Sequence, residues 1–460
     1  MINFQQVRQH QLSKQKKDAP GRGAQILVMG FAAIILVGTA LLKLPFATEP
    51  GHGVTWLDAL FTATSAVTVT GLIVVPTSDT YSLFGEIVIL GLIQVGGIGF
   101  ITLSVLLFRL IGRRVSIYER NLLQQTLGVE GRGGIVNLTL VVIITTVAIE
   151  LIGALLLFVR WVKVLDWPTA LYFSIFHSIS AFCNAGFDLF TSLEDPALLT
   201  LRSSPFMLVN MAILITIGTL GITVIYDVVA WPRERRLSLH TRLVLPFTLG
   251  LTVVGTIVLL LDEFFVDGHA LSQFPPVQSF WVAFFTVVSA RTAGLTLIPM
   301  DQLGQASQLL IFIWMFIGGA PASMGGGVGL STVAVVLITL QSIVLGYSDV
   351  RVLRRTIPTE TVFKAVAVLT VSTILVVLVT FLMLLIEEDT FFPVGFEVVS
   401  AFSNTGYSLG ITGNLSWSSR LLIAFTMFWG RLGPLTLVVA LAQRHRQTFV
   451  HYPEEKIIIG

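Results

Sequence analysis

The chain has 460 residues, of which 54% are hydrophobic and only 12% are charged, and its mean hydropathy is +0.86. This apolar fraction is far above that of an ordinary soluble domain and indicates an integral protein of the lipid bilayer. The formal net charge of +2 argues against a nucleic-acid-binding module, and the single cysteine, Cys183, excludes both an intrachain disulfide framework and a thiolate metal cage.

The apolar stretches along the chain alternate between two lengths. Residues 1–24 are polar and basic. The apolar run that follows them has no small-residue cleavage site, so we expect this run to be a first membrane helix and not a cleaved signal peptide. Stretches of about 20 residues or more, long enough to span a bilayer, lie at 25–46, 84–108, 135–159, 206–230, 243–261, 308–345, 361–386 and 420–443. Shorter stretches, which we expect to be interfacial or re-entrant, lie between them at 57–66, 168–181, 278–290 and 394–402. The order long, short, long therefore occurs four times.

Each short stretch runs into small residues that end in glycine. These segments read TVTGL, CNAGF, RTAGL and SNTGY, and their closing glycines are Gly71, Gly186, Gly294 and Gly406. The glycines are 115, 108 and 112 residues apart, a near-constant period that is typical of a duplicated unit. We predict an all-α integral membrane protein with four consecutive helix/pore-loop/helix repeats around a pseudo-fourfold pore. The repeats would cover residues 25–108, 135–230, 243–345 (with a broken second helix) and 361–443.

Lysine and arginine indicate which loops face the cytoplasm, where they are expected in excess. They cluster at 8–22, 109–132, 233–242, 351–364 and 444–456, always before the first helix of a repeat or after its second. The opposite loops carry mainly acidic residues. We therefore expect a multi-pass protein of the cell (inner) membrane, with cytoplasmic termini at 1–24 and 444–460 and short stretches that enter from outside.

The glycine-closed segments have the composition of a cation site. A re-entrant loop leaves main-chain carbonyls without helical partners, and four such loops around one axis would offer these oxygens to a dehydrated cation. The preceding short helices would point their partially negative ends at it, and glycine permits the positive φ of such a turn. One such segment alone would more simply indicate helix packing, but four at one period favour a selectivity filter. The expected filter residues are Thr68, Val69, Thr70, Gly71, Cys183, Asn184, Ala185, Gly186, Thr292, Ala293, Gly294, Ser403, Asn404, Thr405 and Gly406.

Other unusual residues lie at the predicted membrane depth. Residues 318–332, GGAPASMGGGVGLST, are too rich in glycine for a straight helix, since each glycine costs about 1 kcal/mol relative to alanine. They indicate an intramembrane loop or a kink for close helix approach. Arg431 and Glu150 are ionisable residues inside predicted spans and are therefore functional candidates, with a structural pairing as the alternative. We expect the Arg291 guanidinium to turn away from the pore against neighbouring carbonyls, and His177 to belong to the core.

These segments resemble the Ktr/Trk/HKT superfamily of potassium and sodium translocating proteins, most closely its Ktr-type membrane subunits. LIQVGGIGFITLS at 92–104 and FWGRLGPLTLVVAL at 428–441 also resemble second helices of that family. The resemblance implies a gate formed by the third-repeat loop and held closed through its carbonyls by Arg431, although a lysine common after these glycines is absent here. The implied gate residues are Gly318, Gly319, Ala320, Pro321, Ala322, Ser323, Gly325, Gly326, Gly327 and Arg431.

The resemblance also implies the transported ion and the partners. In the plant branch, serine at the position of Gly71 accompanies sodium selectivity, so glycine points to K+. Na+ stays open as an activating ion, and sodium-selective or sodium-coupled transport is the alternative. The chain has no G-x-x-x-x-G-K motif, and we expect no organic cofactor on it. The implied partners are a second copy in a homodimer and a cytosolic nucleotide-binding (RCK-type) ring, docked on basic loops, with residues 451–460 at a subunit interface. A membrane-embedded enzyme is disfavoured because the seven histidines are scattered.

Overall fold

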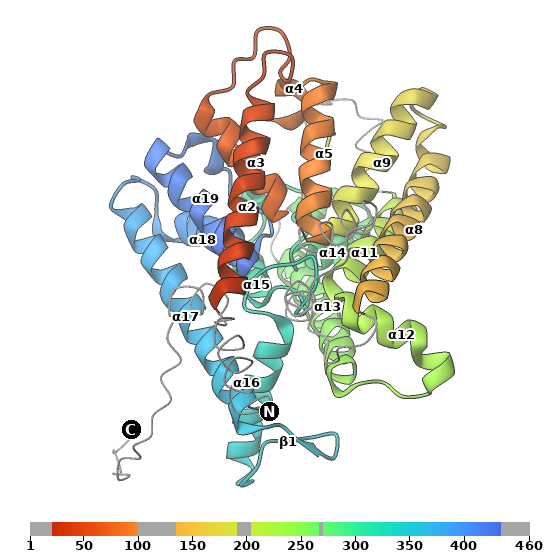
Figure 1. Ribbon diagram of the computed structural model, residues 1–460, viewed down its shortest axis with the longest axis vertical. Helices are drawn as coiled ribbons and strands as arrows, with labels where there is room; N and C mark the ends of the chain where they lie inside the picture. The colour runs from red at the N-terminus through yellow and green to blue at the C-terminus, as the bar shows by residue number, and fades with distance from the viewer. Residues whose placement is uncertain (1–20, 100–134, 191–203, 266–269, 434–460) are drawn as a thin grey trace, which may run out of the picture.

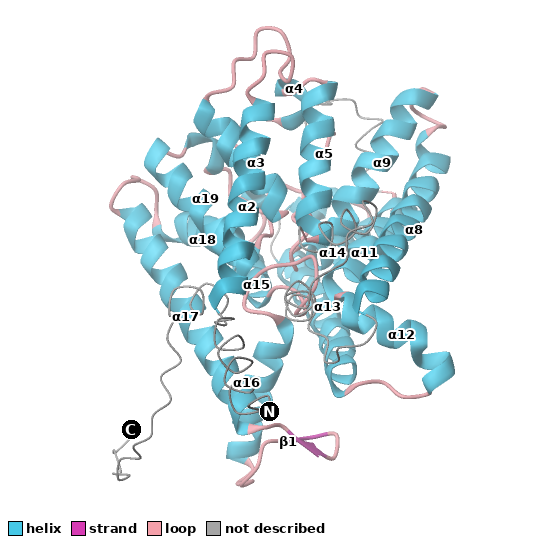
Figure 2. Cartoon of the chain, in the orientation of Figure 1, coloured by secondary structure: helices cyan, strands magenta, loops and turns pink. Residues whose placement is uncertain are grey.

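The computed structural model describes residues 21–99, 135–190, 204–265 and 270–433, and it is mostly helical (Figures 1 and 2). The basic segment 109–132 and both termini at 1–20 and 434–460 lie outside the described residues, so the predictions for them are untested.

Long helices cover the outside of the molecule. Among the described residues, four helices are long and apolar enough to cross a membrane, judged by length and composition, and the bent pair α11–α12 would be a fifth span if counted as one. These four helices are α2 (Gly21–Leu42), α8 (Ile135–Trp161), α13 (Leu239–Phe265) and α17 (Thr359–Leu384). Their large apolar side chains are widely exposed, as expected for helices that contact lipid.

The four short apolar stretches form helices close to their predicted bounds: α3 (Trp56–Thr68), α9 (Trp167–Cys183), α14 (Pro276–Ser289) and α18 (Phe391–Ser403). The start of α3 shows how the sequence sets such a bound. The Thr55 hydroxyl accepts a hydrogen bond from the Asp58 N–H, and the Asp58 carboxylate accepts one from the Thr55 N–H, which together form a capping box. Each short helix packs against a long one, in the pairs α2–α3, α8–α9, α13–α14 and α17–α18.

Each short helix forms a group with the long helix before it and the helix after it, and the third helix of each group ends at a glycine with positive φ. These glycines are Gly99, Gly221, Gly318 and Gly433, which end α5 (Leu83–Ile98), α11 (Pro205–Leu220), α15 (Gln305–Ile317) and α19 (Trp417–Leu432). The predicted break in 308–345 is confirmed, since α16 (Leu330–Val344) resumes after it. The parts of the stretches 84–108 and 420–443 that follow Gly99 and Gly433 lie outside the described residues.

The stretch 206–230 forms two helices separated by a sharp bend, which its composition does not predict. The chain bends by 101° between α11 and α12 (Ile222–Glu234), at Gly221. The carbonyls that the bend leaves without helical partners are used by the glycine-rich loop, because the N–H groups of Ala320 and Met324 donate to the carbonyls of Thr219 and Gly218. The loop thus replaces the next helical turn of α11.

These groups follow one another in a closed cycle. The third helix of each group packs against the short helix of the next group, in the pairs α5–α9, α11–α14 and α15–α18, and α19 packs against α3. An ion pair supports the last contact: Arg420 Nη1 on α19 lies 2.6 Å from Asp58 Oδ1 on α3.

The remaining elements are small connections. The helix α4 (Thr77–Thr80) precedes α5, and single turns η1 (Ala270–Gln273), η2 (Met300–Gln302) and η3 (Thr412–Asn414) lie in other connections. The basic segment 351–364 contains a two-stranded antiparallel hairpin, β1 (Arg351–Val352) with β2 (Arg355–Thr356). It lies at the end of the molecule that α16 reaches (Figure 1).

Candidate cation pathway

The chain reverses direction at the end of each short helix. We define loop 1 as residues 68–71, loop 2 as 183–186, loop 3 as 292–294 and loop 4 as 403–406. The predicted positive φ of the closing glycines is confirmed, at 84° for Gly71, 72° for Gly186, 65° for Gly294 and 95° for Gly406. The residue two positions earlier also has positive φ, in the left-handed helical region in loops 1, 2 and 4, which ends the helix there and turns the chain.

The four closing glycines form a closed ring of main-chain contacts. A Cβ atom placed on Gly71 would lie 2.6 Å from the carbonyl oxygen of Ala185, and one on Gly186 would lie 2.7 Å from that of Ala293. A Cβ on Gly294 would clash with the carbonyl of Thr405, and one on Gly406 with the carbonyl of Thr70. Each loop therefore touches the next one, and loop 4 returns to loop 1. Only glycine allows this approach, because the clashing atoms belong to the main chain.

Serine side chains on the short helices support the loops. In loops 1 and 4, the N–H of the closing glycine donates to a serine hydroxyl, from Gly71 to Ser65 and from Gly406 to Ser400, both at 3.0 Å. In loop 2 the Ser180 hydroxyl donates to the Phe187 carbonyl at 2.7 Å. Sequence reasoning missed these serines. The Ser-Ala pair that opens SAVTVTG, SAFCNAG and SAFSNTG was the available signal.

Loop 3 departs from the other three because it is shorter by one residue. Its serine, Ser289, lies five positions before the closing glycine in SARTAG, whereas the others lie six positions before it. The Ser289 carbonyl accepts hydrogen bonds from the N–H groups of both Ala293 and Gly294, at 2.8 and 3.1 Å. Thr292 has a φ of 104° in place of the 52–58° seen in the other loops. The ring is therefore only approximately fourfold.

Asparagine and threonine join neighbouring loops. The side-chain carbonyl of Asn184 accepts from the hydroxyls of Thr292, at 3.1 Å, and Thr219, at 2.9 Å. Asn404 Nδ2 lies 2.9 Å from the Thr70 hydroxyl. These contacts bridge loop 2 to loop 3 and loop 4 to loop 1, so only alternate junctions of the ring carry an asparagine.

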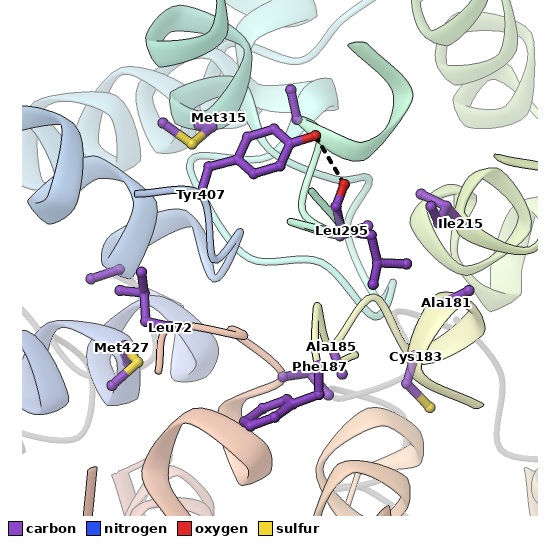
Figure 3. Packing of buried hydrophobic residues seen from close by; sticks show 14 of the residues in the cluster. Leu72, Ala181, Cys183, Ala185, Phe187, Ile215, Leu295, Met315, Tyr407 and Met427 are labelled. Carbon is purple, nitrogen blue, oxygen red and sulfur yellow. Dashed lines mark hydrogen bonds between the residues drawn. The ribbon is translucent and has the colours of Figure 1, made fainter. Parts of the chain in front are cut away.

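A large buried side chain follows each closing glycine and anchors its loop. These residues are Leu72, Phe187, Leu295 and Tyr407, which lie around the meeting point of the loops (Figure 3). The Tyr407 hydroxyl donates to the carbonyls of Leu295, at 3.3 Å, and Thr286, at 3.2 Å. Loop 4 is thereby held against loop 3.

The glycine-rich loop between Ile317 and Leu330 contacts one side of the ring. A Cβ on Gly325 would lie 2.5 Å from the Thr292 hydroxyl, and one on Gly326 would lie 2.9 Å from the Ser403 carbonyl. The glycines therefore let the loop reach loops 3 and 4 directly. Within the loop, the Gly319 N–H donates to the Gly326 carbonyl at 3.2 Å.

Arg431, in the last turn of α19, ties this loop to α5. Its Nη1 donates to the Met324 carbonyl, and its Nη2 donates to the carbonyls of Gly96, at 2.5 Å, and Gly97, at 3.2 Å. Gly96 and Gly97 lie in the last turn of α5, where carbonyls lack helical partners. One guanidinium thus joins three segments that are far apart in the chain.

The structure also locates the other singled-out residues. Arg291 is 3% exposed, and its Nε and Nη2 have no hydrogen-bond partner among the described residues, so the expected carbonyl contacts are not seen for these nitrogens. His177 packs in the core with Nδ1 2.8 Å from the Phe173 carbonyl, and its Nε2 accepts from the Leu189 N–H. Glu150 lies behind loop 2, where its carboxyl group contacts Gln94 and Cys183.

Known proteins resemble this chain over most of its length. The TrkH family model, described as cation transport protein, matches residues 1–452. Ktr system potassium uptake protein B of Bacillus subtilis is 36% identical over 436 residues, which is 95% of this chain and 96% of that protein. Potassium/sodium uptake protein NtpJ of Enterococcus hirae is 33% identical, over 95% of this chain and 97% of that protein. The crystal structure of the potassium transporter TrkH from Vibrio parahaemolyticus has the same fold, with a TM-score of 0.70 at 19% identity over 92% of this chain and 85% of that one. The chain therefore belongs to the TrkH family of cation transport proteins.

Proposed function

We propose that this protein takes up potassium ions across the cytoplasmic membrane through the centre of the glycine ring. The observation that carries the proposal is the closed cycle of main-chain contacts from Gly71 through Gly186 and Gly294 to Gly406. Such a ring gathers carbonyl oxygens and four helix C-terminal ends, a combination that suits a partly dehydrated cation. The B. subtilis relative is named a potassium uptake protein, which supports K+ as the ion.

In this proposal the fifteen residues named above from the four loops form the selectivity filter. The chain is then four helix/pore-loop/helix repeats at 25–108, 135–230, 243–345 and 361–443, arranged around a pseudo-fourfold pore in the inner membrane. The basic loops and both termini are cytoplasmic, which follows the positive-inside rule. An inside-negative potential of 100 mV supplies about 2.3 kcal/mol per charge, enough for roughly 50-fold accumulation without a separate energy source.

The glycine-rich loop, residues 318–327, is the proposed gate. It contacts loops 3 and 4, and Arg431 connects it to the end of α5 through the carbonyls of Met324 and Gly96. We assign Arg431 the role of holding the loop across the pathway.

The proposed assembly is a homodimer on a cytosolic nucleotide-binding ring of the RCK type. The B. subtilis relative is named as part of a Ktr system, which supports a multi-component uptake system. The exposed basic hairpin at Arg351 and Arg355 offers positive charge for docking. The proposal assigns no organic cofactor to this chain. The chain belongs to a family of cation transport proteins, and we propose no enzymatic activity for it.

Sodium-selective or sodium-coupled transport is the second candidate, with Na+ as activator a further variant. The E. hirae relative is named a potassium/sodium uptake protein, which favours this candidate. Gly71→Ser and Gly71→Ala both add a Cβ atom that clashes with the main chain of loop 2, so both should lower the total flux, and they differ only in the hydroxyl. The K+/Na+ ratio is therefore compared on the flux that remains in each variant. If Gly71 favours K+, the serine variant has a lower K+/Na+ flux ratio than the alanine variant.

Growth of a bacterium that lacks its own potassium uptake systems tests the proposal. The chain is expressed with and without a regulatory ring subunit in medium of limiting K+. We expect growth to be rescued at least in the presence of the ring. Failure in both conditions, with the protein present in the membrane, would contradict the proposal.

A further inference from the structure

Glu150 lies in the membrane-spanning helix α8 and has no part in the pathway described so far. It is 5% exposed. Its Oε2 accepts a hydrogen bond from Gln94 Nε2 of α5 at 2.9 Å, and its Oε1 lies 3.7 Å from the Cys183 thiol at the end of α9. Its main-chain carbonyl accepts from the Ser178 hydroxyl of α9 at 2.6 Å. A single residue therefore connects α5, α8 and the start of loop 2.

Cys183 differs from the residues that occupy its position in loops 1 and 4. There, the hydroxyls of Thr68 and Ser403 pair with the hydroxyls of Thr70 and Thr405, each at 2.7 Å. Loop 2 has Ala185 at the corresponding position, so no such hydroxyl is available. Loop 2 therefore lacks the internal brace of loops 1 and 4.

The thiol of Cys183 turns to the back of the loop instead. It lies 3.7 Å from Gln94 Oε1 and 3.7 Å from Glu150 Oε1, and its one proton can be donated to either oxygen. Its sulfur points away from the meeting point of the loops in Figure 3. Gly97 makes room for it, since a Cβ there would lie 2.6 Å from the sulfur. Contacts of the Cys183 thiol with Gln94 and Glu150 thus take the place of the hydroxyl pair found within loops 1 and 4.

An ionisable side chain within a membrane span is expensive to bury, so a purely packing role would be served better by an apolar residue. We propose that Glu150, together with Gln94, is a positioning residue for loop 2: it holds the Cys183 thiol behind the loop, fixes the main chain of residues 183–186 and thereby contributes to ion selectivity. The selectivity part rests on the proposed function of the ring.

Cys183 is the only cysteine of the chain, so thiol modification reports on this site alone. The first measurement is the rate at which a small methanethiosulfonate reagent modifies the purified full-length protein in detergent. The variants are Glu150→Leu, which removes the hydrogen bonds of the Glu150 carboxyl group to Gln94 and Cys183, and Glu150→Gln, which keeps an amide oxygen for Gln94. Glu86→Leu is the matched control, because Glu86 is also buried and accepts a hydrogen bond from Tyr172 at 2.6 Å, away from loop 2.

We expect Glu150→Leu to be modified about tenfold faster than the wild type, a factor at the upper end of what loss of one typical hydrogen bond gives. Glu150→Gln and Glu86→Leu should react at the wild-type rate. Equal rates for Glu150→Leu and the wild type would overturn the positioning role. A fast rate in Glu150→Gln would overturn the part assigned to hydrogen bonding.

The second measurement is the K+/Na+ flux ratio in liposomes. It should fall in Glu150→Leu and return toward the wild-type ratio in Glu150→Gln, and an unchanged ratio in both would overturn the contribution to selectivity. If Glu150→Leu does not fold, Gln94→Met removes the same support from α5 and carries the same expectations. A wild-type protein without K+ flux would instead count against the proposed function, while the modification rates would still test the geometry.

Discussion

The guanidinium of Arg431 donates a hydrogen bond to the main-chain carbonyl of Met324, 107 residues earlier in the chain. The same side chain reaches the carbonyls of Gly96 and Gly97. It therefore holds the glycine-rich loop to two helix ends that belong to different groups of the cycle.

Replacing Arg431 should release this loop. We expect Arg431→Ala to raise the basal K+ flux by on the order of tenfold, because hydrogen bonds to a charged group contribute about 1.5–3 kcal/mol. Rubidium flux into liposomes measures the change. Arg160→Ala, at an exposed arginine in the last turn of α8, is the control and should leave the flux unchanged. A folded Arg431→Ala protein with wild-type or lower flux would refute the gating role.

The ring contacts predict different outcomes for two nearby glycines. Gly406 and Gly410 have similar positive φ values, 95° and 91°, but only Gly406 has main-chain atoms in the space that a Cβ would occupy. Alanine at Gly410 should lower stability by about 1–2 kcal/mol, because its backbone conformation is unfavourable for side chains, and alanine at Gly406 should lower it further, because the added Cβ would also clash with the main chain of loop 1. Only Gly406→Ala should also reduce K+ flux, by at least about tenfold. Equal fluxes in the two variants would argue against a pathway through the ring.

The ion pair between Arg420 and Asp58 should stabilise the contact between α19 and α3. The two side chains are 21% and 10% exposed, so solvent screens the pair only in part. We expect a coupling free energy of about 1–2 kcal/mol in a double-mutant cycle of Arg420→Gln and Asp58→Asn. Asparagine retains an oxygen for the cap of α3. Thermal unfolding in detergent gives the four stabilities, and strictly additive effects would exclude the pair as a stabilising link.

Glu387, just beyond α17, gives a prediction for pH. Burial alone would raise the pKa of its carboxyl, but hydrogen bonds from Ser419 and Ser416 outweigh burial and lower the pKa. The Ser416 hydroxyl donates at 2.7 Å and its N–H at 3.0 Å. A carboxyl whose pKa is lowered by folding contributes stability above its unfolded pKa, about 4.3, and this is lost as pH falls through the folded value. The unfolding midpoint of the wild type should therefore fall more steeply below about pH 4 than that of Glu387→Gln, and parallel profiles would contradict this.

Sequence patterns predicted those features that depend on local composition. The short helices, the break after Ile317 and the positive φ of Gly71 follow from apolar length and from glycine at defined positions. These signals are visible in one stretch of chain at a time. Repetition at one period then made a weak local signal informative.

Contacts between residues that are far apart in the chain could not be predicted from the sequence. A lone glycine such as Gly221 costs only about 1 kcal/mol in a helix, so the local sequence did not predict the 101° bend there. The carbonyls that the bend frees accept hydrogen bonds from residues 320–324. The placement of Glu150 beside Cys183 likewise requires α5, α8 and α9 to be packed together first. In SARTAG of loop 3, the serine is one residue nearer to the closing glycine than in the other three segments. This difference does not show when the segments are compared only at their closing glycines.

The most direct test of the central claim is the flux of K+ and Na+ into liposomes that contain the purified protein, driven by an inside-negative potential. K+ uptake should exceed Na+ uptake at equal concentrations, should fall strongly in Gly406→Ala and should be retained in Gly410→Ala. Absence of K+ flux in the wild type with and without the regulatory ring, or a flux that persists unchanged in Gly406→Ala, would contradict this claim.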